Sequence, residues 1–204
     1  MGKWQPHDHF FQRAKRQGFV ARSVYKLEEV DRRVGLLKPG YKVLDLGCYP
    51  GSWLQYCSRA VGKNGLVVGV DIQPVDISLP TNVHIIACDV FNLLPTDLFR
   101  YSSTFDVVLS DLAPATTGIR SVDSARSAML VEKALALAAS LLQPGGHFVA
   151  KIFQGSELDV LNKKLRTMFE RVRGIRPRAV RKGSRELYLV ALGKRQASSD
   201  LPEQ

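Results

Sequence analysis

Two kinds of apolar pattern alternate along the chain. Short continuous runs of β-branched residues, typical of strands buried on both faces, are bounded by turn residues. Between them, apolar residues recur every three or four positions, which is typical of helices that cover a sheet. We predict strands at 42–46, 66–71, 83–87, 105–110 and 147–151, and helices at about 22–34, 125–142 and 156–168.

Local signals place two of the helix ends. The sequence Pro144-Gly145-Gly146 predicts the end of the helix at 125–142. The Ser-x-x-Asp pattern from Ser156 to Asp159 resembles a capping box and predicts the start of the next helix.

The alternation of strand and helix predicts an α/β fold with a parallel, doubly wound sheet, in which ligands bind at the carboxyl ends of the strands. Two further runs, 172–175 and 186–192, are joined by residues 176–185, a connection too short for a crossover helix. We therefore expect a seven-stranded, mostly parallel sheet with helices on both faces and an antiparallel last strand. We expect one domain over 1–195, a basic helical extension at 1–40 within it, and a disordered tail at 196–204.

Composition narrows the class of protein. The chain has 204 residues, 45% of them hydrophobic and 24% charged, which suits a globular domain and argues against long disorder. Its apolar stretches are too short to span a membrane, and its amino terminus lacks the apolar core of a secretory signal, so we expect a cytoplasmic protein. The three cysteines form no Cys-x-x-Cys pair, so we expect reduced thiols and no metal site.

Positive charge is concentrated at the two ends of the chain. Residues 1–42 carry ten Lys and Arg against four Asp and Glu, and residues 151–204 carry thirteen against six. Residues 43–150 carry six against nine. If both ends fold onto one face, they form a surface suited to a nucleic acid, although charge alone suits a merely solubilising surface equally well.

The turn after the first predicted strand indicates a ligand other than a dinucleotide. Gly47 and Gly51 allow the backbone to approach a ligand closely, but Tyr49-Pro50 replaces the middle glycine of the dinucleotide-binding pattern. Asp45, just before the turn, opposes a phosphate and suits a cationic group.

Carboxylates also end the next three strands. Asp71 lies where a ribose acceptor is expected, and Asp89 can accept a hydrogen bond from an adenine amino group. Asp111 closes the fourth strand, and Trp53 can pack beside a ligand or belong to the core. This edge of the sheet therefore suits an adenosine-type ligand.

These motifs, with a set of separated polar residues, resemble the FtsJ (RrmJ-type) family of S-adenosylmethionine-dependent ribosomal RNA 2′-O-ribose methyltransferases. The resemblance runs from about His9 to Lys194. It rests on segments 47–53, 110–114, 151–155 and 184–188, on Asp71 and Asp89, and on Lys26, Asp111, Lys151 and Glu186, which correspond to the family's Lys-Asp-Lys-Glu tetrad.

The resemblance implies a Rossmann-like methyltransferase fold and methylation of a uridine ribose in large-subunit (23S) ribosomal RNA, within the assembled subunit. It implies that S-adenosylmethionine is held by Gly47, Gly51, Trp53, Asp71, Asp89 and Asp111. It assigns the catalysis to Lys26, Asp111, Lys151 and Glu186.

Within the tetrad, we assign Lys151 to orient the 2′-hydroxyl and take its proton, for which it must be neutral. Lys26 binds a neighbouring phosphate or steadies the developing alkoxide, and Glu186 orients a lysine or the ribose. Any one of these residues alone would be interpreted as an ordinary surface charge, and only the set indicates catalysis.

Four alternatives remain. Transfer RNA is a possible substrate, although the run 149–155 looks more like the ribosomal branch. A small-molecule O-methyltransferase would not need the basic ends, and a NAD-dependent oxidoreductase would need the missing glycine. A non-catalytic RNA-binding module would not need the tetrad. We take a monomer as the default state.

Overall fold

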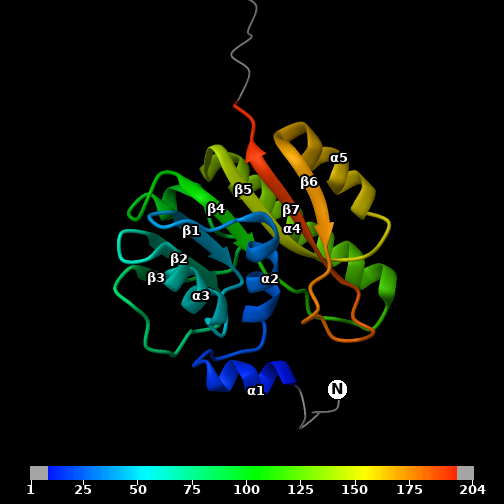
Figure 1. Ribbon diagram of the computed structural model, residues 1–204. Coiled ribbons are helices and arrows are strands. Elements are labelled where there is room, and N and C mark those ends of the chain that lie inside the picture. Colours follow the sequence, from blue (N-terminus) through cyan, green and yellow to red (C-terminus); the bar gives the residue numbers. More distant parts are fainter. Residues whose placement is uncertain (1–8, 197–204) are drawn as a thin grey trace, which may run out of the picture.

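The computed structural model describes residues 9–196, which form a seven-stranded sheet with helices on both faces (Figure 1). The helices are α1 (His9–Arg16), α2 (Val24–Val34), α3 (Ser52–Val61), the short 3-10 helix η1 (Pro95–Leu98), α4 (Arg120–Leu141) and α5 (Leu158–Met168). The strands are β1 (Lys42–Leu46), β2 (Leu66–Asp71), β3 (Val83–Ala87), β4 (Phe105–Ser110), β5 (Leu142–Phe153), β6 (Phe169–Ile175) and β7 (Glu186–Lys194).

The strand order is β3-β2-β1-β4-β5-β7-β6. Strands β1 to β5 pair in parallel, and β7 pairs antiparallel with both β5 and β6. The predicted mostly parallel sheet with an antiparallel last strand is therefore confirmed. The order reverses between β1 and β4, where an open α/β sheet has its ligand crevice.

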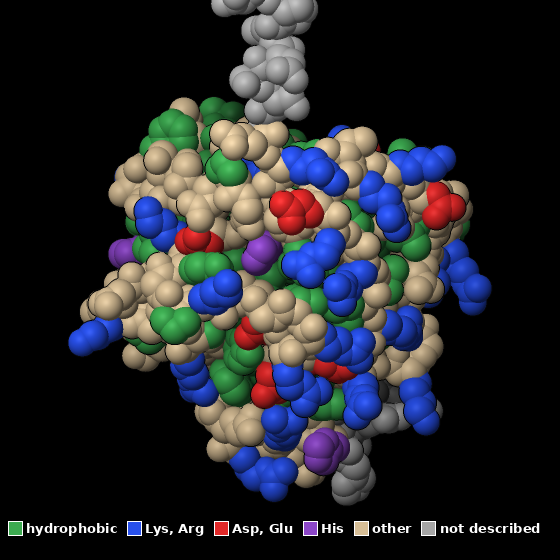
Figure 2. Space-filling model, turned by 45° about the horizontal axis from the view of Figure 1, so that its top comes forward, with side chains coloured by type: hydrophobic (Ala, Val, Ile, Leu, Met, Phe, Trp, Pro, Cys, Tyr) green, Lys and Arg blue, Asp and Glu red, His purple; other side chains and the backbone are tan. Residues whose placement is uncertain are grey.

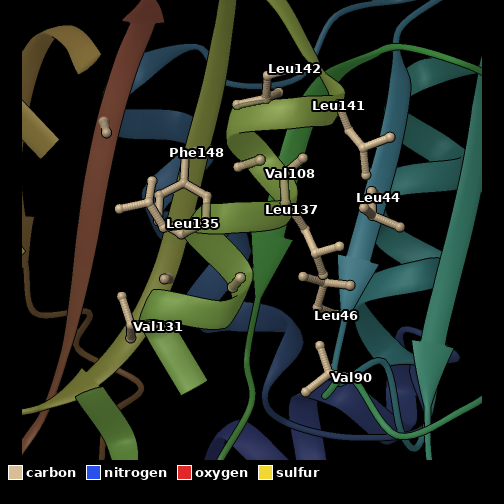
Figure 3. Packing of buried hydrophobic residues seen from close by; sticks show 14 of the residues in the cluster. Leu44, Leu46, Val90, Val108, Val131, Leu135, Leu137, Leu141, Leu142 and Phe148 are labelled. Carbon is tan, nitrogen blue, oxygen red and sulfur yellow. The ribbon is translucent and has the colours of Figure 1, made fainter. Parts of the chain in front are cut away.

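Each face of the sheet carries its own hydrophobic core. Leu44 and Leu46 of β1 join the core on the side of α4 and α5, shown in Figure 3, with Leu135 and Phe148. Val43, one position before Leu44, joins the opposite core with residues of α2 and α3. Successive strand residues alternate between the two faces of the sheet. A strand covered on both faces therefore needs apolar residues at successive positions, which explains the continuous apolar runs in the sequence.

Several predicted boundaries were wrong. α4 starts at Arg120 instead of Ala125, and β5 starts at Leu142, so Pro144 to Gly146 lie within the strand. The chain leaves α4 at Leu141, and the next residue already pairs with Phe105 of β4, which no local signal reveals.

The predicted capping box at Ser156 was also wrong, since α5 starts at Leu158 without a side-chain cap. The Ser156 hydroxyl bonds instead to the neighbouring Glu157 carboxylate, at 3.1 Å. The extension predicted at 1–40 contains two separate helices in its described part, α1 and α2.

Other sequence predictions concern cysteines, membranes and the tail. Cys48 and Cys57 are buried, Cys88 is half-buried and all three are free thiols, as predicted. No helix within residues 9–196 is long and apolar enough to cross a membrane. No group of three or more metal-ligating side chains gathers in that same part of the chain. The tail predicted to be disordered lies, apart from Gln196, outside the described residues.

Candidate active site

The tetrad residues come from four elements that meet at one edge of the sheet. Asp111 follows β4, and Lys151 lies near the carboxyl end of β5. Because β7 runs antiparallel to β5, its first residue, Glu186, lies at this same edge, opposite Phe153. Lys26 reaches the edge from the first turn of α2. The structure thus brings together four residues separated by up to 160 positions.

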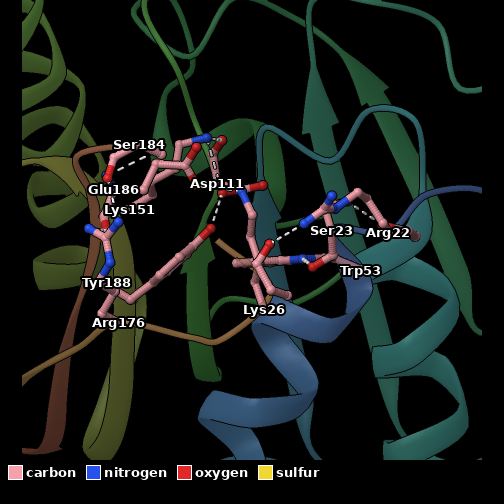
Figure 4. A network of polar contacts seen from close by, with 12 residues as sticks. Arg22, Ser23, Lys26, Trp53, Asp111, Lys151, Arg176, Ser184, Glu186 and Tyr188 are labelled. Atoms are coloured by element: carbon pink, nitrogen blue, oxygen red, sulfur yellow. Dashed lines mark hydrogen bonds and ion pairs between the residues drawn. The ribbon is translucent and has the colours of Figure 1, made fainter. Parts of the chain in front are cut away.

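The four side chains form two ion pairs (Figure 4). Lys151 Nζ lies 3.1 Å from Asp111 Oδ1 and donates a hydrogen bond of 2.6 Å to the backbone carbonyl of Asp111. Lys26 Nζ donates to Glu186 Oε2 at 2.5 Å. Lys151 is only 7% exposed, so its side-chain nitrogen is held in place by protein partners instead of water. Such fixed charges are suited to stabilising charge that develops during a reaction.

Tyr188 joins the two pairs, and sequence reasoning did not single it out. Its hydroxyl donates to Asp111 Oδ1 at 2.7 Å, and Lys26 Nζ lies 6.0 Å from the centre of its ring. Burial and the charge of Asp111 raise the pKa of Tyr188 well above its ordinary value, so it remains a hydrogen-bond donor. The sequence could have indicated Tyr188, because side chains two positions apart on a strand lie on the same face, and Glu186 is two positions before Tyr188.

The turn after β1 packs closely against two neighbouring segments because it has no side chains at two positions. Gly47 and Gly51 both have positive φ, 81° and 107°. A Cβ on Gly47 would lie 2.9 Å from the backbone nitrogen of Leu112, and one on Gly51 would lie 2.6 Å from the side chain of Ile77. Both glycines are therefore required for the close approach of this turn to its neighbours.

Asp45, the second-last residue of β1, is fully buried, and neither of its carboxylate oxygens has a hydrogen-bond partner among the described residues. Burial, followed by the charges of Asp111 and Asp71, raises its pKa well above the ordinary value. An unsatisfied buried carboxyl is costly unless something else pairs with it. Together with the glycine turn, it fits a cationic ligand at this edge.

The other two acidic strand ends are partly engaged with the backbone. Asp71 accepts the amides of Tyr49 and Gln73 at 2.9 Å each, which orders the glycine turn. Asp89 accepts the amide of Phe91 through Oδ1 at 3.0 Å. Since a carboxylate has about four acceptor positions, both keep capacity for ligand hydroxyl or amino groups.

Trp53 lies in the core and positions the start of α2. Its indole is 3% exposed, packs against Tyr188 at 6.0 Å between ring centres, and donates through Nε1 to the carbonyl of Ser23 at 2.9 Å. The hydroxyls of Ser23 and Ser52 bond at 2.8 Å. These contacts fix the turn of α2 that carries Lys26.

Two basic parts of the described chain, α1 with α2 and residues 176–185, form one unit beside the tetrad. Glu29 of α2, 8% exposed, accepts the amide of Arg178 at 2.7 Å, and Arg22 donates to the carbonyl of Ala179. Ala179 also packs against Ala14 of α1. The lower and right-hand parts of Figure 2, where Figure 1 places α1, α5 and β6, show crowded Lys and Arg side chains with few carboxylates.

The chain is similar to known proteins over nearly its whole length. The FtsJ-like methyltransferase family model matches residues 19–194. A ribosomal RNA large subunit methyltransferase E from Desulfatibacillum aliphaticivorans is 48% identical over 197 residues, covering 97% of this chain and 95% of its own. One of the same name from Syntrophobacter fumaroxidans is 49% identical over 191 residues, covering 93% and 97%.

A solved structure, a ribosomal RNA methyltransferase from Plasmodium falciparum, superimposes with a TM-score of 0.77 at 28% identity and covers 88% of this chain and 100% of its own. The resemblance inferred from the motifs is thereby confirmed over almost the whole sheet. The chain belongs to the FtsJ-like methyltransferase family.

Proposed function

We propose that the protein transfers a methyl group from S-adenosylmethionine to the ribose 2′-oxygen of a uridine in large-subunit ribosomal RNA. The observation that carries the proposal is the paired tetrad of Lys26, Asp111, Lys151 and Glu186, placed between an acidic ligand edge and a basic surface. Both relatives described above bear the name of a large-subunit ribosomal RNA methyltransferase.

The acidic edge suits the cofactor. Bound there, S-adenosylmethionine supplies an activated methyl on a positively charged sulfur. Gly47 and Gly51 let the backbone approach it, and Asp71 and Asp89 accept hydrogen bonds from its ribose and adenine. We assign the unpartnered Asp45 to the cationic end of the cofactor, because a positive neighbour would satisfy its buried carboxyl.

Asp111 and Trp53 take different parts in the proposed cofactor site. Asp111 borders both the cofactor edge and Lys151, so it takes part in binding and in catalysis. Trp53 contributes by shaping the site from within the core, through Tyr188 and Ser23, instead of by packing on an exposed ligand face.

Within the tetrad, Lys151 orients the 2′-hydroxyl and accepts its proton as the oxygen attacks. An ammonium cannot accept a proton, so only protein with neutral Lys151 is active, and Asp111 fixes the direction of its amine. Lys26, held by Glu186, lies ready to stabilise the developing alkoxide or the adjacent phosphate. Alignment of the reacting atoms at roughly 3 Å supplies much of the remaining acceleration.

The basic unit beside the tetrad supports RNA as the substrate. The basic unit formed by α1, α2 and residues 176–185 suits an RNA backbone, with arginine and lysine contacts to phosphates. We propose that residues 1–195 act as one domain, as a monomer in the cytoplasm, on the assembled large ribosomal subunit.

The experiment uses large ribosomal subunits from cells that lack this protein. Methyl-labelled S-adenosylmethionine is added with the purified protein, and nuclease digestion separates ribose label from base label. Ribose label on a uridine of the large-subunit RNA is the expected result. Label that appears only on transfer RNA, or only on a small hydroxylated molecule, would refute the substrate and leave the cofactor assignment standing.

A further inference from the structure

A hollow lies directly beside the tetrad, and the methyl transfer itself does not account for it. Its volume is about 230 Å³, and it opens to the surface between the loop before α4 and the start of β7. Its lining includes Thr116, Asp123, Phe153, Ser184, Arg185 and Glu186. It shares Glu186 with the tetrad, so a molecule in this hollow would also reach the catalytic residues.

The position of Phe153 relative to Lys151 matches the dimensions of one nucleoside. Lys151 pairs with Tyr188 across the strands, and Phe153 pairs with Glu186, so all four side chains lie on one face of the sheet. Residues two apart on a strand are separated by about 6–7 Å. Phe153 therefore lies within the length of one nucleoside from a ribose whose 2′-oxygen meets Lys151.

The rim of the hollow is held in shape by hydrogen bonds. Asp123, 4% exposed, accepts the amide of Thr117 at 2.7 Å, its hydroxyl at 2.9 Å and the amide of Gly118 at 3.2 Å. These contacts lower the pKa of Asp123, so it keeps its charge and holds the loop at neutral pH. The loop that carries Thr116 is thereby fixed to the first turn of α4.

Two arginines fix the opposite rim. Arg185 donates to the carbonyls of Arg120 and Gln154, at 3.3 and 3.5 Å, and so joins α4, the end of β5 and the start of β7. Arg176 donates to the carbonyls of Ser184, at 2.5 Å, and Glu186, at 3.3 Å. The hollow is therefore formed before a ligand arrives, which reduces the ordering cost of binding.

We propose that this hollow receives the base of the nucleotide whose ribose is methylated, turned out of the RNA and stacked on Phe153. The inference rests on the proposed function and adds the base-binding site to it. The hollow is smaller than the roughly 300–1,000 Å³ of pockets for drug-sized ligands, which suits a single base. Aromatic side chains that stack on splayed bases, with polar groups at the base edges, are the usual means of reading single-stranded RNA.

The edges of the hollow carry the polar groups that such a base needs. The hydroxyls of Thr116 and Ser184 can each donate and accept, and the backbone at Gly183 adds further polar groups. Glu186 lies on the side toward the ribose, where Lys26 already holds it. Neighbouring residues of β5 and β7 therefore contact the base and the sugar of the same nucleotide.

The test compares Phe153→Leu and Phe153→Tyr with the wild type on large ribosomal subunits that lack the modification. Stacking on an aromatic ring contributes a factor of roughly 5 to 150 per base, so kcat/KM should fall by that factor in Phe153→Leu. Phe153→Tyr keeps a ring and should remain within about threefold of the wild type. Phe99→Leu, which changes an exposed phenylalanine beside η1, is the matched control and should have no effect.

Two further measurements distinguish a loss of kcat/KM caused by lost stacking from one caused by a damaged fold. Affinity for S-adenosylmethionine and the melting temperature should be unchanged in both Phe153 variants. Subunits prepared with 4-thiouridine in their RNA should crosslink on irradiation to Phe153 or to residues 183–185.

The outcomes are distinguishable. If wild-type protein places no label on ribose, the proposed function is wrong. If the wild type does label ribose, two results would show that the base site is wrong while the function stands. One is full kcat/KM in Phe153→Leu, and the other is a loss of kcat/KM in Phe153→Tyr as large as that in Phe153→Leu. Crosslinks of the target uridine confined to residues outside the hollow would also overturn the base site.

Discussion

The hydroxyl of Tyr188 donates a hydrogen bond of 2.7 Å to Asp111 Oδ1, the same oxygen that Lys151 approaches at 3.1 Å. Tyr188 is fully buried, and burial together with the charge of Asp111 raises its pKa well above the ordinary value. The phenol therefore stays protonated and holds the carboxylate in one orientation. Through that carboxylate, it also sets the direction of the Lys151 amine.

Tyr188→Phe should accordingly slow methyl transfer without loss of cofactor or RNA binding. A hydrogen bond to a charged group contributes about 1.5–3 kcal/mol, which corresponds to a decrease in kcat of roughly 10- to 150-fold. Steady-state kinetics on ribosomal subunits, with KM determined separately for each substrate, provide the measurement. Tyr101→Phe serves as control, and an unchanged kcat in Tyr188→Phe would exclude a positioning role.

Lys151→Ala should remove the proton acceptor while leaving the cofactor edge intact. General acid–base groups typically contribute roughly 10²- to 10⁴-fold, so we expect at least about a 100-fold loss of methyl transfer. Calorimetric titration with S-adenosylmethionine should give nearly the wild-type affinity, because Asp111 keeps its bond to Tyr188. Retained turnover in this variant would take Lys151 out of the catalytic role, and Lys63→Ala is the matched lysine control.

Charge removal on the loop before β7 should weaken RNA binding in a salt-dependent way. Arg181 and Lys182 are exposed, and the positive charge of Arg181 contributes to the lowered pKa of Arg22, after the larger effect of burial. The double variant Arg181→Ala, Lys182→Ala should raise KM for the subunits. It should also reduce the slope of log affinity against log salt by about one for each phosphate that the variant no longer binds.

Filter binding at several salt concentrations provides this measurement. Lys63 is exposed in the turn before β2, at the opposite edge of the sheet, so Lys63→Ala should leave both affinity and slope unchanged. Equal effects from the two edges would mean that the protein has no localised RNA surface.

His147 should make the fold less stable at mildly acidic pH. It is half-buried on β5, its Nδ1 accepts the amide of Gly193 at 3.2 Å, and burial lowers its pKa below the ordinary 6.5. The unfolded chain therefore binds a proton more readily than the folded one below about pH 6.5. The resulting contribution to stability is complete above that pH and decreases as the pH falls toward the folded-state value.

Thermal melting from mildly alkaline to mildly acidic pH, across the ordinary histidine pKa of about 6.5, tests this prediction. The melting temperature of the wild type should fall more over this range than that of His147→Gln, because glutamine keeps an acceptor for Gly193 but does not titrate. Identical pH profiles in the two proteins would show that His147 has no part in the loss of stability.

The sequence by itself determined the sheet and its ligand edge. Apolar runs such as 66–71 and 105–110 identify strands because a strand covered on both faces needs apolar residues at nearly every position. Asp71 and Asp111 could be placed at one edge because parallel strands all end on the same side. These inferences needed only local patterns and the direction of the strands.

Only the tertiary structure decided which side chains meet. Lys26 and Glu186 pair across 160 positions because the loop before β7 docks on α2 through Glu29. Tyr188 looks in the sequence like one more apolar strand residue, and Phe153 lies beyond the strand predicted at 147–151. Only the register of β5 and β7 places both beside the tetrad. Local patterns report which face of an element is buried, but the partner of a side chain depends on elements far away in the sequence, and so does a hollow between them.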